Sequence, residues 1–231
     1  MNSQITLEQE IGIRSYTRKI FIYMAIALFI SAVTAYLSIY TGFFILFLEM
    51  TFYYGHIVLL FAQLGLVFFI SKRLNKASYK TLLTLFFVYS ILTGFTFSIY
   101  LLVYEITSIF LAFGLTCILF INLAIIGYTT KMDLTKISTI LFGGLITLII
   151  ITIVNRFLQI DILTTILNYL GVIIFVGITA YDVQKIKVSY LENEDNPEFL
   201  DKFTIFCSLN LYLDFINMFI YILRIIGKKK N

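Results

Sequence analysis

The sequence predicts an all-α polytopic membrane protein with seven transmembrane helices, and two observations support this prediction. Hydrophobic residues make up 60% of the 231 residues and charged residues only 13%, whereas soluble domains carry roughly half and a quarter. The 13 acidic and 17 basic residues gather in short clusters that separate long uncharged runs. A chain of this size cannot hide so much apolar surface from water, so lipid has to cover it.

Seven runs are each close to the length of roughly 20 residues that a helix needs to cross about 30 Å of hydrocarbon. They cover residues 20–40, 51–71, 81–104, 106–128, 137–155, 162–181 and 203–223. The first run is too long for the core of a signal peptide, so we interpret it as the first membrane helix. Residues 41–50 either extend the second helix or lie at the interface. The chain then divides into a cytoplasmic N-terminal segment 1–19, a single membrane domain 20–227 and a basic tail 228–231.

Basic residues predict the orientation, because loops rich in Lys and Arg stay in the cytoplasm. With a cytoplasmic N-terminus, the inner segments hold twelve basic residues and the three outer loops hold only Arg156. The twelve are Arg14, Arg18, Lys19, Lys72, Arg73, Lys76, Lys80, Lys131, Lys136, Lys185, Lys187 and Lys202. The tail, which carries Arg224 and residues 228–230, is the exception. Either the last helix crosses against the rule or it re-enters and returns, and we favour seven full spans.

The sequence argues against metalloenzyme and nucleotide chemistry. His56 is the single histidine, and no cluster of cysteines and histidines accompanies it, so no zinc site is expected. Cys117 and Cys207 lie inside apolar runs, where cysteine usually packs as a small hydrophobic side chain. The chain contains no phosphate loop, nucleotide fingerprint or nucleophile elbow. We therefore expect no bound cofactor, no enzymatic activity and no nucleic-acid partner.

Two aspartates inside the runs are the residues most informative about function. Asp182 ends the sixth run and Asp214 lies in the middle of the seventh. A carboxylate near mid-membrane is costly unless it is paired, hydrated or protonated. The connection at about residues 188–202 is short enough for an antiparallel hairpin. The two carboxyl groups are therefore expected to face each other at a similar depth, near the cytoplasmic side.

Polar residues share a face with each aspartate. At 100° per residue, Cys207, Asn210, Asn217 and Tyr221 lie within about 60° of Asp214 on its helix, with Arg224 a little farther round. On the side of Asp182 lie Thr179, Asn168 and Thr164. A polar stripe of this kind belongs in the interior of a helix bundle or against water.

Two carboxyl groups held together cannot both ionise at low cost, so they share a proton and titrate as a unit. A basic group could instead pair with one acid, and Lys72 and Arg73 are the candidates. The pair is then either an ionic tie between helices or a pH-responsive gate and cation site.

Five motifs in order resemble the Bax inhibitor-1 family, and bacterial members above all. The final helix reads LNLYLDFINMFIYILRIIG (209–227), and the sixth ends GITAYDVQKIK (177–187). Upstream, the chain reads QLGLVFFISKRLNK (63–76), GFTFSIYLLVYEITSIF (94–110) and GYTTKMDLTKI (127–137). The resemblance extends from about residue 14 to residue 230.

This resemblance implies a last helix surrounded by the other six, and a pH-sensitive calcium leak across a bacterial cytoplasmic membrane. It also implies that Asp182 and Asp214 form the proton sensor, with a basic latch at Arg73 or, if the alignment shifts by one, Lys72. Many family members carry Glu where this chain has Gln63. Any acidic role at that position is therefore lost or moved.

The expected mechanism is a gate at the aspartate pair. Calcium accepts six to eight oxygen ligands in flexible geometry, and the two aspartates would bind it transiently with help from water. The polar residues expected to line the path are Asn210, Asn217, Tyr221 and Thr179.

Two other functions are compatible with two aspartates in membrane helices. An intramembrane aspartyl protease also needs two helical aspartates, but LYLD at 211–214 lacks the glycines of the G-x-G-D motif. The stronger alternative is a regulatory protein without transport, which binds a partner such as a membrane protease.

Overall fold

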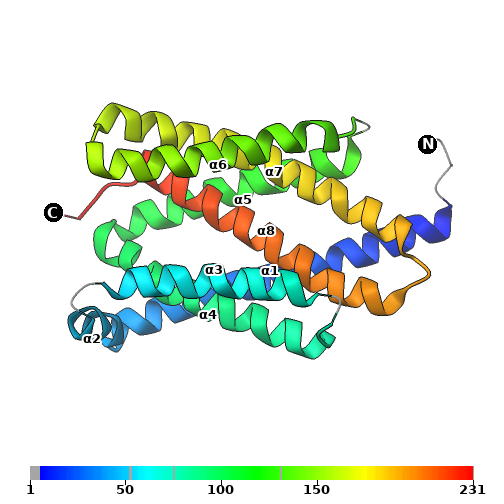
Figure 1. The fold of residues 1–231 in the computed structure, drawn as a ribbon, viewed down its shortest axis with the longest axis horizontal. Helices are drawn as coiled ribbons and strands as arrows, with labels where there is room; N and C mark the ends of the chain where they lie inside the picture. Colours follow the sequence, from blue (N-terminus) through cyan, green and yellow to red (C-terminus); the bar gives the residue numbers. More distant parts are fainter. Residues whose placement is uncertain (1–5, 52–53, 75, 131, 231) are drawn as a thin grey trace. The chain divides into compact units, whose positions relative to one another are not determined.

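A computed structural model describes residues 6–51, 54–74, 76–130 and 132–230 of the chain (Figure 1). Parts of the predicted terminal segments (residues 1–5 and 231) and Lys131 of the predicted inner loops lie outside the described residues. The helices are α1 (Leu7–Tyr40), α2 (Phe43–Met50), α3 (Gly55–Arg73), α4 (Tyr79–Val103), α5 (Ile106–Thr129), α6 (Thr135–Leu158), α7 (Asp161–Glu192) and α8 (Pro197–Ile226).

All helices except α2 are long and apolar enough to cross a membrane, which makes seven spans among the described residues. The all-α class and the seven membrane helices are therefore confirmed. The apolar stretch of α8 is 67% buried, against 11% to 44% in the others; the surrounding of α8 by the other six helices stays a prediction. Because α8 is continuous over 30 residues, or about 45 Å, it has no reversal that would allow re-entry.

Three helices continue beyond the apolar runs that predicted them. The chain starts α1 at Leu7, ends α7 at Glu192 and starts α8 at Pro197, so the connection expected at 188–202 is only 193–196. An apolar run ends where the helix leaves the lipid. The hydrogen bonds of the helix backbone can continue into water, so the helix is longer than the run. Proline suits the first turn of a helix, where its missing N–H costs nothing. The side chain of Asn196 caps α8 by accepting from the Phe199 N–H at 3.1 Å.

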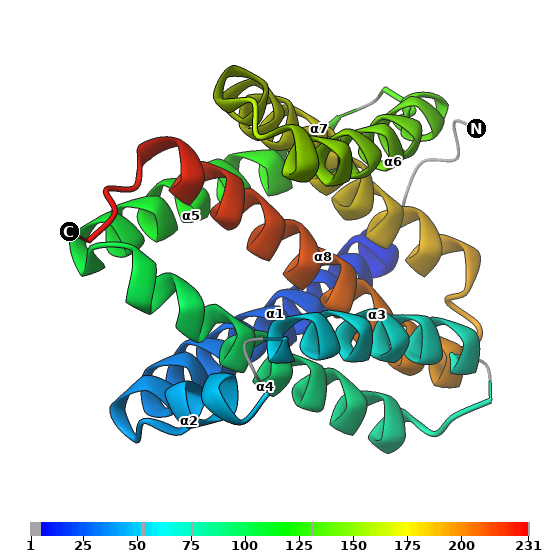
Figure 2. The same cartoon turned by 60° about the vertical axis from the view of Figure 1, so that its left-hand side comes forward.

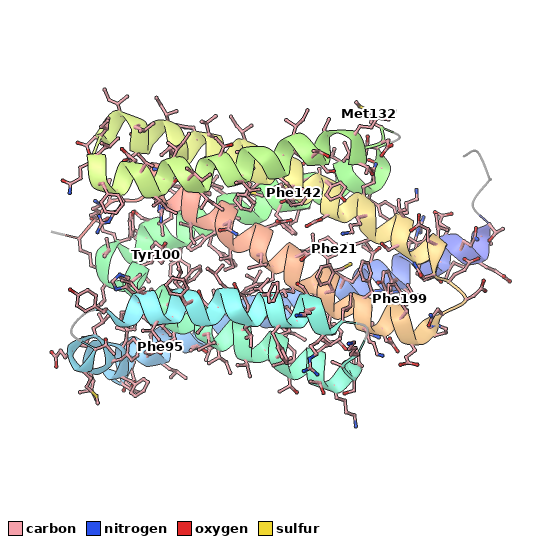
Figure 3. The ribbon with its side chains drawn as sticks, in the orientation of Figure 1. Phe21, Phe95, Tyr100, Met132, Phe142 and Phe199 are labelled. Atoms are coloured by element: carbon pink, nitrogen blue, oxygen red, sulfur yellow. The ribbon has the colours of Figure 1, made fainter. Side chains whose placement is uncertain are left out.

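The segment 41–50, left open by the sequence, forms the separate eight-residue helix α2. Gly42 adopts a positive φ of 71° and allows the chain to turn between α1 and α2. Phe95 of α4, labelled in Figure 3, holds α2 by contacting the rings of Phe43, Phe44 and Phe47 with centroids 5.1–5.6 Å apart. The second span therefore begins at Gly55 instead of extending α2.

The chain folds as two compact units, one formed by residues 1–103 and 189–212, the other by 104–188 and 213–231. In the first unit, α1 and α4 touch where Gly94 faces the backbone of Ser31. The Ser31 hydroxyl donates to the Ser90 carbonyl at 2.7 Å, and it shares a 2.6 Å hydrogen bond with the Tyr212 hydroxyl. Tyr212 is fully buried, so this network fixes the first half of α8 within the unit.

The second unit contains α5, α6, most of α7 and the last part of α8. Figure 2 shows the same helices from another side. Glycines again mark the close approaches. A side chain at Gly177 of α7 would collide with Leu141 of α6, and one at Gly127 of α5 would collide with Ala180 of α7. Between α5 and α8, Phe215 packs against Phe113 and Phe120 at centroid distances of 5.4 and 5.5 Å.

A Gly94→Ala substitution should destabilise the protein, because the new methyl group would lie 2.7 Å from the Ser31 Cα. Overpacking of this kind typically costs about 1–3 kcal/mol, so the melting temperature of the purified protein in detergent should fall by several degrees. Gly114→Ala is the matched control, since its methyl group would meet nothing within 4 Å. The control should melt at the wild-type temperature or slightly above it. Equal melting temperatures for the two variants would contradict the tight α1–α4 contact.

Candidate functional site

The structure brings Asp182 and Asp214 together inside the second unit. Both side chains are buried, with 8% and 4% of their surface exposed. Their carboxyl groups lie within hydrogen-bonding reach of each other. Asp214 Oδ2 is buried, and no hydroxyl or N–H of the described residues donates to it. Two buried carboxyl groups this close cannot both ionise at low cost.

Thr179 is the polar residue closest to this contact. Its side chain is fully buried one turn before Asp182 and reaches the Asp214 carboxyl group. The hydroxyl donates its proton to the Phe175 carbonyl at 2.7 Å. Thr179 is therefore a polar neighbour of the pair whose hydroxyl is bonded to the backbone of its own helix.

The α7 side of the pair is positioned from three directions. A Cβ at Gly127 would lie 2.5 Å from the Ala180 carbonyl, so only glycine lets α5 come this close to α7. The ring of Phe142, labelled in Figure 3, stands edge-on to Tyr181 at 6.1 Å. Gln184 ties the α5–α6 connection to α7. Its amide donates to the Met132 carbonyl at 2.7 Å, and it accepts from the Leu134 N–H at 2.9 Å.

Lys185 is the basic side chain whose charge acts on Asp182. Sequence reasoning overlooked both Lys185 and Gln184, although each stands within three residues of Asp182. For Lys185 the spacing was the available signal, because residues three or four apart share a helix face. Gln184, two residues from Asp182, had no such signal, and the predicted counter-charges were Lys72 and Arg73.

Three of the four polar residues expected to line a path, Asn210, Asn217 and Tyr221, occupy the less buried side of α8, whereas Thr179 is fully buried on α7. Among residues 206–224, the half-buried and exposed positions are Phe206, Asn210, Leu213, Asn217, Ile220, Tyr221 and Arg224. They recur every three or four residues, as one face of a helix does. The Asn217 amide donates to the Leu213 carbonyl of its own helix at 2.8 Å.

Tyr221 has a packing role that the sequence did not suggest. Its ring fills the space left by Gly171, where an added Cβ would lie 2.6 Å from the ring. The ring also contacts Phe175 at 6.0 Å, and the Arg224 guanidinium lies 5.9 Å from its centroid. Tyr221 thus fixes α8 against α7. Lining of a path by Asn210, Asn217, Tyr221 and Thr179 stays a prediction.

Lys72 and Arg73 are exposed at the end of α3, in the first unit. Their charges lie over Phe68 and Phe69 of the same helix, at 5.8 and 5.2 Å from the ring centroids. The role of either residue as a latch stays a prediction. On the same helix the Gln63 amide donates to the Thr96 hydroxyl at 3.0 Å, a contact that an ionised Glu could not make as a donor.

Metal binding at this site would have to rely on few protein ligands. In the described part of the chain, no group of three or more His, Cys, Asp or Glu side chains is placed to hold a metal ion. The two aspartates alone provide carboxylates at the pair. If a hard cation bound there, water would have to complete its coordination; calcium binding by the pair stays a prediction.

Fold and site together define an integral membrane protein whose seven spans bury a pair of carboxyl groups. A family model described as "Inhibitor of apoptosis-promoting Bax1" matches residues 13–231. The chain is 41% identical over 234 residues to an uncharacterized protein of Borreliella burgdorferi, covering 97% of each chain. It is 35% identical over 232 residues to the inner membrane protein YbhL of Escherichia coli strain K12, covering 99% of this chain and 97% of the relative. An uncharacterized membrane protein of Streptococcus pyogenes is 32% identical over 99% of both chains. The chain therefore belongs to the Bax inhibitor-1 family.

The contact between the two carboxyl groups can be tested by cross-linking. In a Cys117→Ala/Cys207→Ala background, the pair Asp182→Cys/Asp214→Cys should be joined efficiently by a short bifunctional thiol reagent. A protease site inserted at 193–196 makes the linkage visible on a denaturing gel, because a linked chain stays in one piece after cleavage. The control pair Asp182→Cys/Tyr221→Cys should link poorly, since Tyr221 lies about 10 Å farther along α8. Equal linkage of both pairs would show that the aspartates are not neighbours.

Proposed function

We propose that this protein is a pH-sensitive cation leak, with calcium as the principal ion, gated by Asp182 and Asp214. The observation that supports the proposal is the buried contact between the carboxyl groups of Asp182 and Asp214. One oxygen of that contact, Asp214 Oδ2, has no hydrogen-bond donor among the described residues. Buried ionisable residues in membrane helices most often mark ion or proton paths. Membership of the Bax inhibitor-1 family supports a membrane protein, and the gating is our proposal.

In the closed state the pair shares one proton, which joins α7 to α8. When the proton leaves, two carboxylates face each other in a medium of low dielectric constant and repel strongly. The same charges attract a divalent cation. Calcium would take oxygen ligands from the pair and water, with the side chains of Asn210 and Asn217 along the path. Weak binding suits conduction, because an ion has to leave as easily as it enters.

We also propose where the protein is located and what it binds. We place the protein in a bacterial cytoplasmic membrane with its N-terminus in the cytoplasm, on the basis of its basic loops. The E. coli relative is named an inner membrane protein, which agrees with this location. The lipid bilayer, calcium and protons are the proposed partners. Transport needs no catalytic residue, and no enzymatic role is proposed.

Calcium influx into vesicles holding the purified protein should be several-fold higher at pH 8 than at pH 6, because the pair loses its proton as pH rises. Asp182→Asn and Asp214→Asn should each flatten this difference, since an amide cannot lose the proton. Asp161→Asn is the matched control, an exposed aspartate on the same helix as Asp182. Its pH response should equal that of the wild type.

Calcium flux no greater than that of empty vesicles at both pH values would contradict the leak hypothesis. The regulatory protein that binds a membrane partner would then become the leading account. Co-purification of that partner from native membranes would support it.

The latch is tested by a separate series. If a basic side chain of α3 holds the pair closed, Arg73→Ala should raise the flux at pH 6 towards its level at pH 8. If the latch stands one residue earlier, Lys72→Ala should have this effect instead. Lys76→Ala removes an exposed basic residue beyond α3 and should change nothing. Wild-type behaviour of both Arg73→Ala and Lys72→Ala would remove the latch from the mechanism.

A further inference from the structure

The residues after α8 are bound to the start of α5 by main-chain hydrogen bonds. The Glu105 N–H donates to the Lys228 carbonyl at 2.9 Å, and the Lys228 N–H donates to the Ser108 hydroxyl at 3.0 Å. Next to them, Tyr104 and Lys229 form an antiparallel bridge. We call residues 227–229 the tail strap. All of these residues belong to the second unit.

The strap begins at Gly227, where the chain passes closely over the ring of Tyr104. A Cβ at Gly227 would lie 2.7 Å from the ring of Tyr104 and would also collide with the Leu223 carbonyl. Tyr104 itself is buried, with 8% of its surface exposed. Glycine is therefore the residue that allows the chain to leave α8 and pass over this ring. The Lys228 and Lys229 side chains are exposed, so main-chain atoms, and not lysine charges, make the attachment.

The strap completes a ring of contacts that joins α7 and α8, which carry the aspartate pair, to α5. On one side, α5 meets α7 where Gly127 faces Ala180. On the next, α7 meets α8 where Gly171 accommodates Tyr221. The third side joins α8 to α5, through Phe215 in the middle and through the strap at the end of α8. In Figure 1 the end of α8 and the start of α5 lie side by side.

An α-helix is stiff along its axis, so a restraint at one end acts on every residue of it. A slide of α8 by one residue would displace Asp214 by about 1.5 Å. A hydrogen bond between oxygen atoms spans about 2.5–3.0 Å, so such a slide would break the contact with Asp182. A restraint at Lys228 can thus control the spacing of the carboxyl groups although it lies several turns away.

We propose that the tail strap is a positioning element that sets the axial register of α8 and thereby holds Asp214 against Asp182. The register does not depend on ion conduction. The consequence for gating rests on the function proposed above: a released strap would separate the carboxyl groups and change the pH response of the flux.

The decisive experiment repeats the Asp182→Cys/Asp214→Cys cross-linking in three forms of the protein that differ only in the tail. One has the natural tail, one lacks residues 228–231, and one carries Lys228→Gln, Lys229→Gln and Lys230→Gln. Deletion should lower the linked fraction at a fixed time by about threefold or more, because freer helices reduce the effective concentration of the two thiols. The charge-neutral tail should link like the natural one, since its main-chain bonds persist.

A milder variant separates the effect of losing the strap from the effect of misfolding in the deleted protein. Ser108→Ala removes one of the hydrogen bonds of the strap and should lower the linked fraction by a smaller factor. All variants should elute as single peaks in detergent. Undiminished linkage in both the deletion and Ser108→Ala would overturn the proposal, and so would a loss caused by the charge-neutral tail alone.

Flux measurements on the same tails, with both aspartates present, separate this proposal from the leak. If the strap also regulates conduction, deletion should shift the pH midpoint of calcium influx, and the charge-neutral tail should not. Reduced cross-linking after deletion, in a protein without flux, would support the strap and remove the leak. Unchanged cross-linking after deletion, together with normal pH-dependent flux, would contradict the role of the strap and support the leak.

Discussion

A carboxyl group removed from water has to keep a proton or find a counter-charge, and Asp182 and Asp214 face this requirement together. Each is nearly fully buried, and each is the nearest acidic partner of the other. Ionising both in a medium of low dielectric constant would cost far more than in water. The helices around them therefore have to hold the carboxyl groups at a distance that one proton can bridge.

Glycines provide much of that control, because they let helix backbones approach until little relative movement is left. Gly127 brings α5 against α7 beside Asp182, and Gly171 receives the ring of Tyr221 beyond Asp214. Small residues serve the same purpose in membrane helix pairs generally, where burial of apolar surface contributes little. Lipid is as apolar as leucine, so tight packing has to come from shape. In this unit the packing also determines how the acid pair is presented.

α8 has a different surrounding in each half. Up to Tyr212 the helix belongs to the first unit, where the Tyr212 hydroxyl joins the hydrogen-bonded network of Ser31. From Leu213 onward it belongs to the second unit and carries Asp214. Burial of its polar residues follows the helix face and not the half: Tyr212 and Asp214 are buried, whereas Asn210 and Asn217 lie on the less buried side. The same helix thus combines structural polar contacts with those proposed for function.

The sequence alone determined the membrane class, the seven spans and the two aspartates, because the cost of placing polar groups in lipid leaves a direct mark on composition. It did not determine the length of α7 and α8 or the separate helix α2, since hydrophobicity reports lipid contact and not helix ends. The sequence predicted that Asp182 and Asp214 face each other, but their contact within hydrogen-bonding reach, the packing of Tyr221 on Gly171 and the hydrogen bond between Glu105 and Lys228 were decided only by the tertiary structure. These contacts join residues far apart in the chain, and their distances depend on how whole helices pack, which no local pattern of residues encodes.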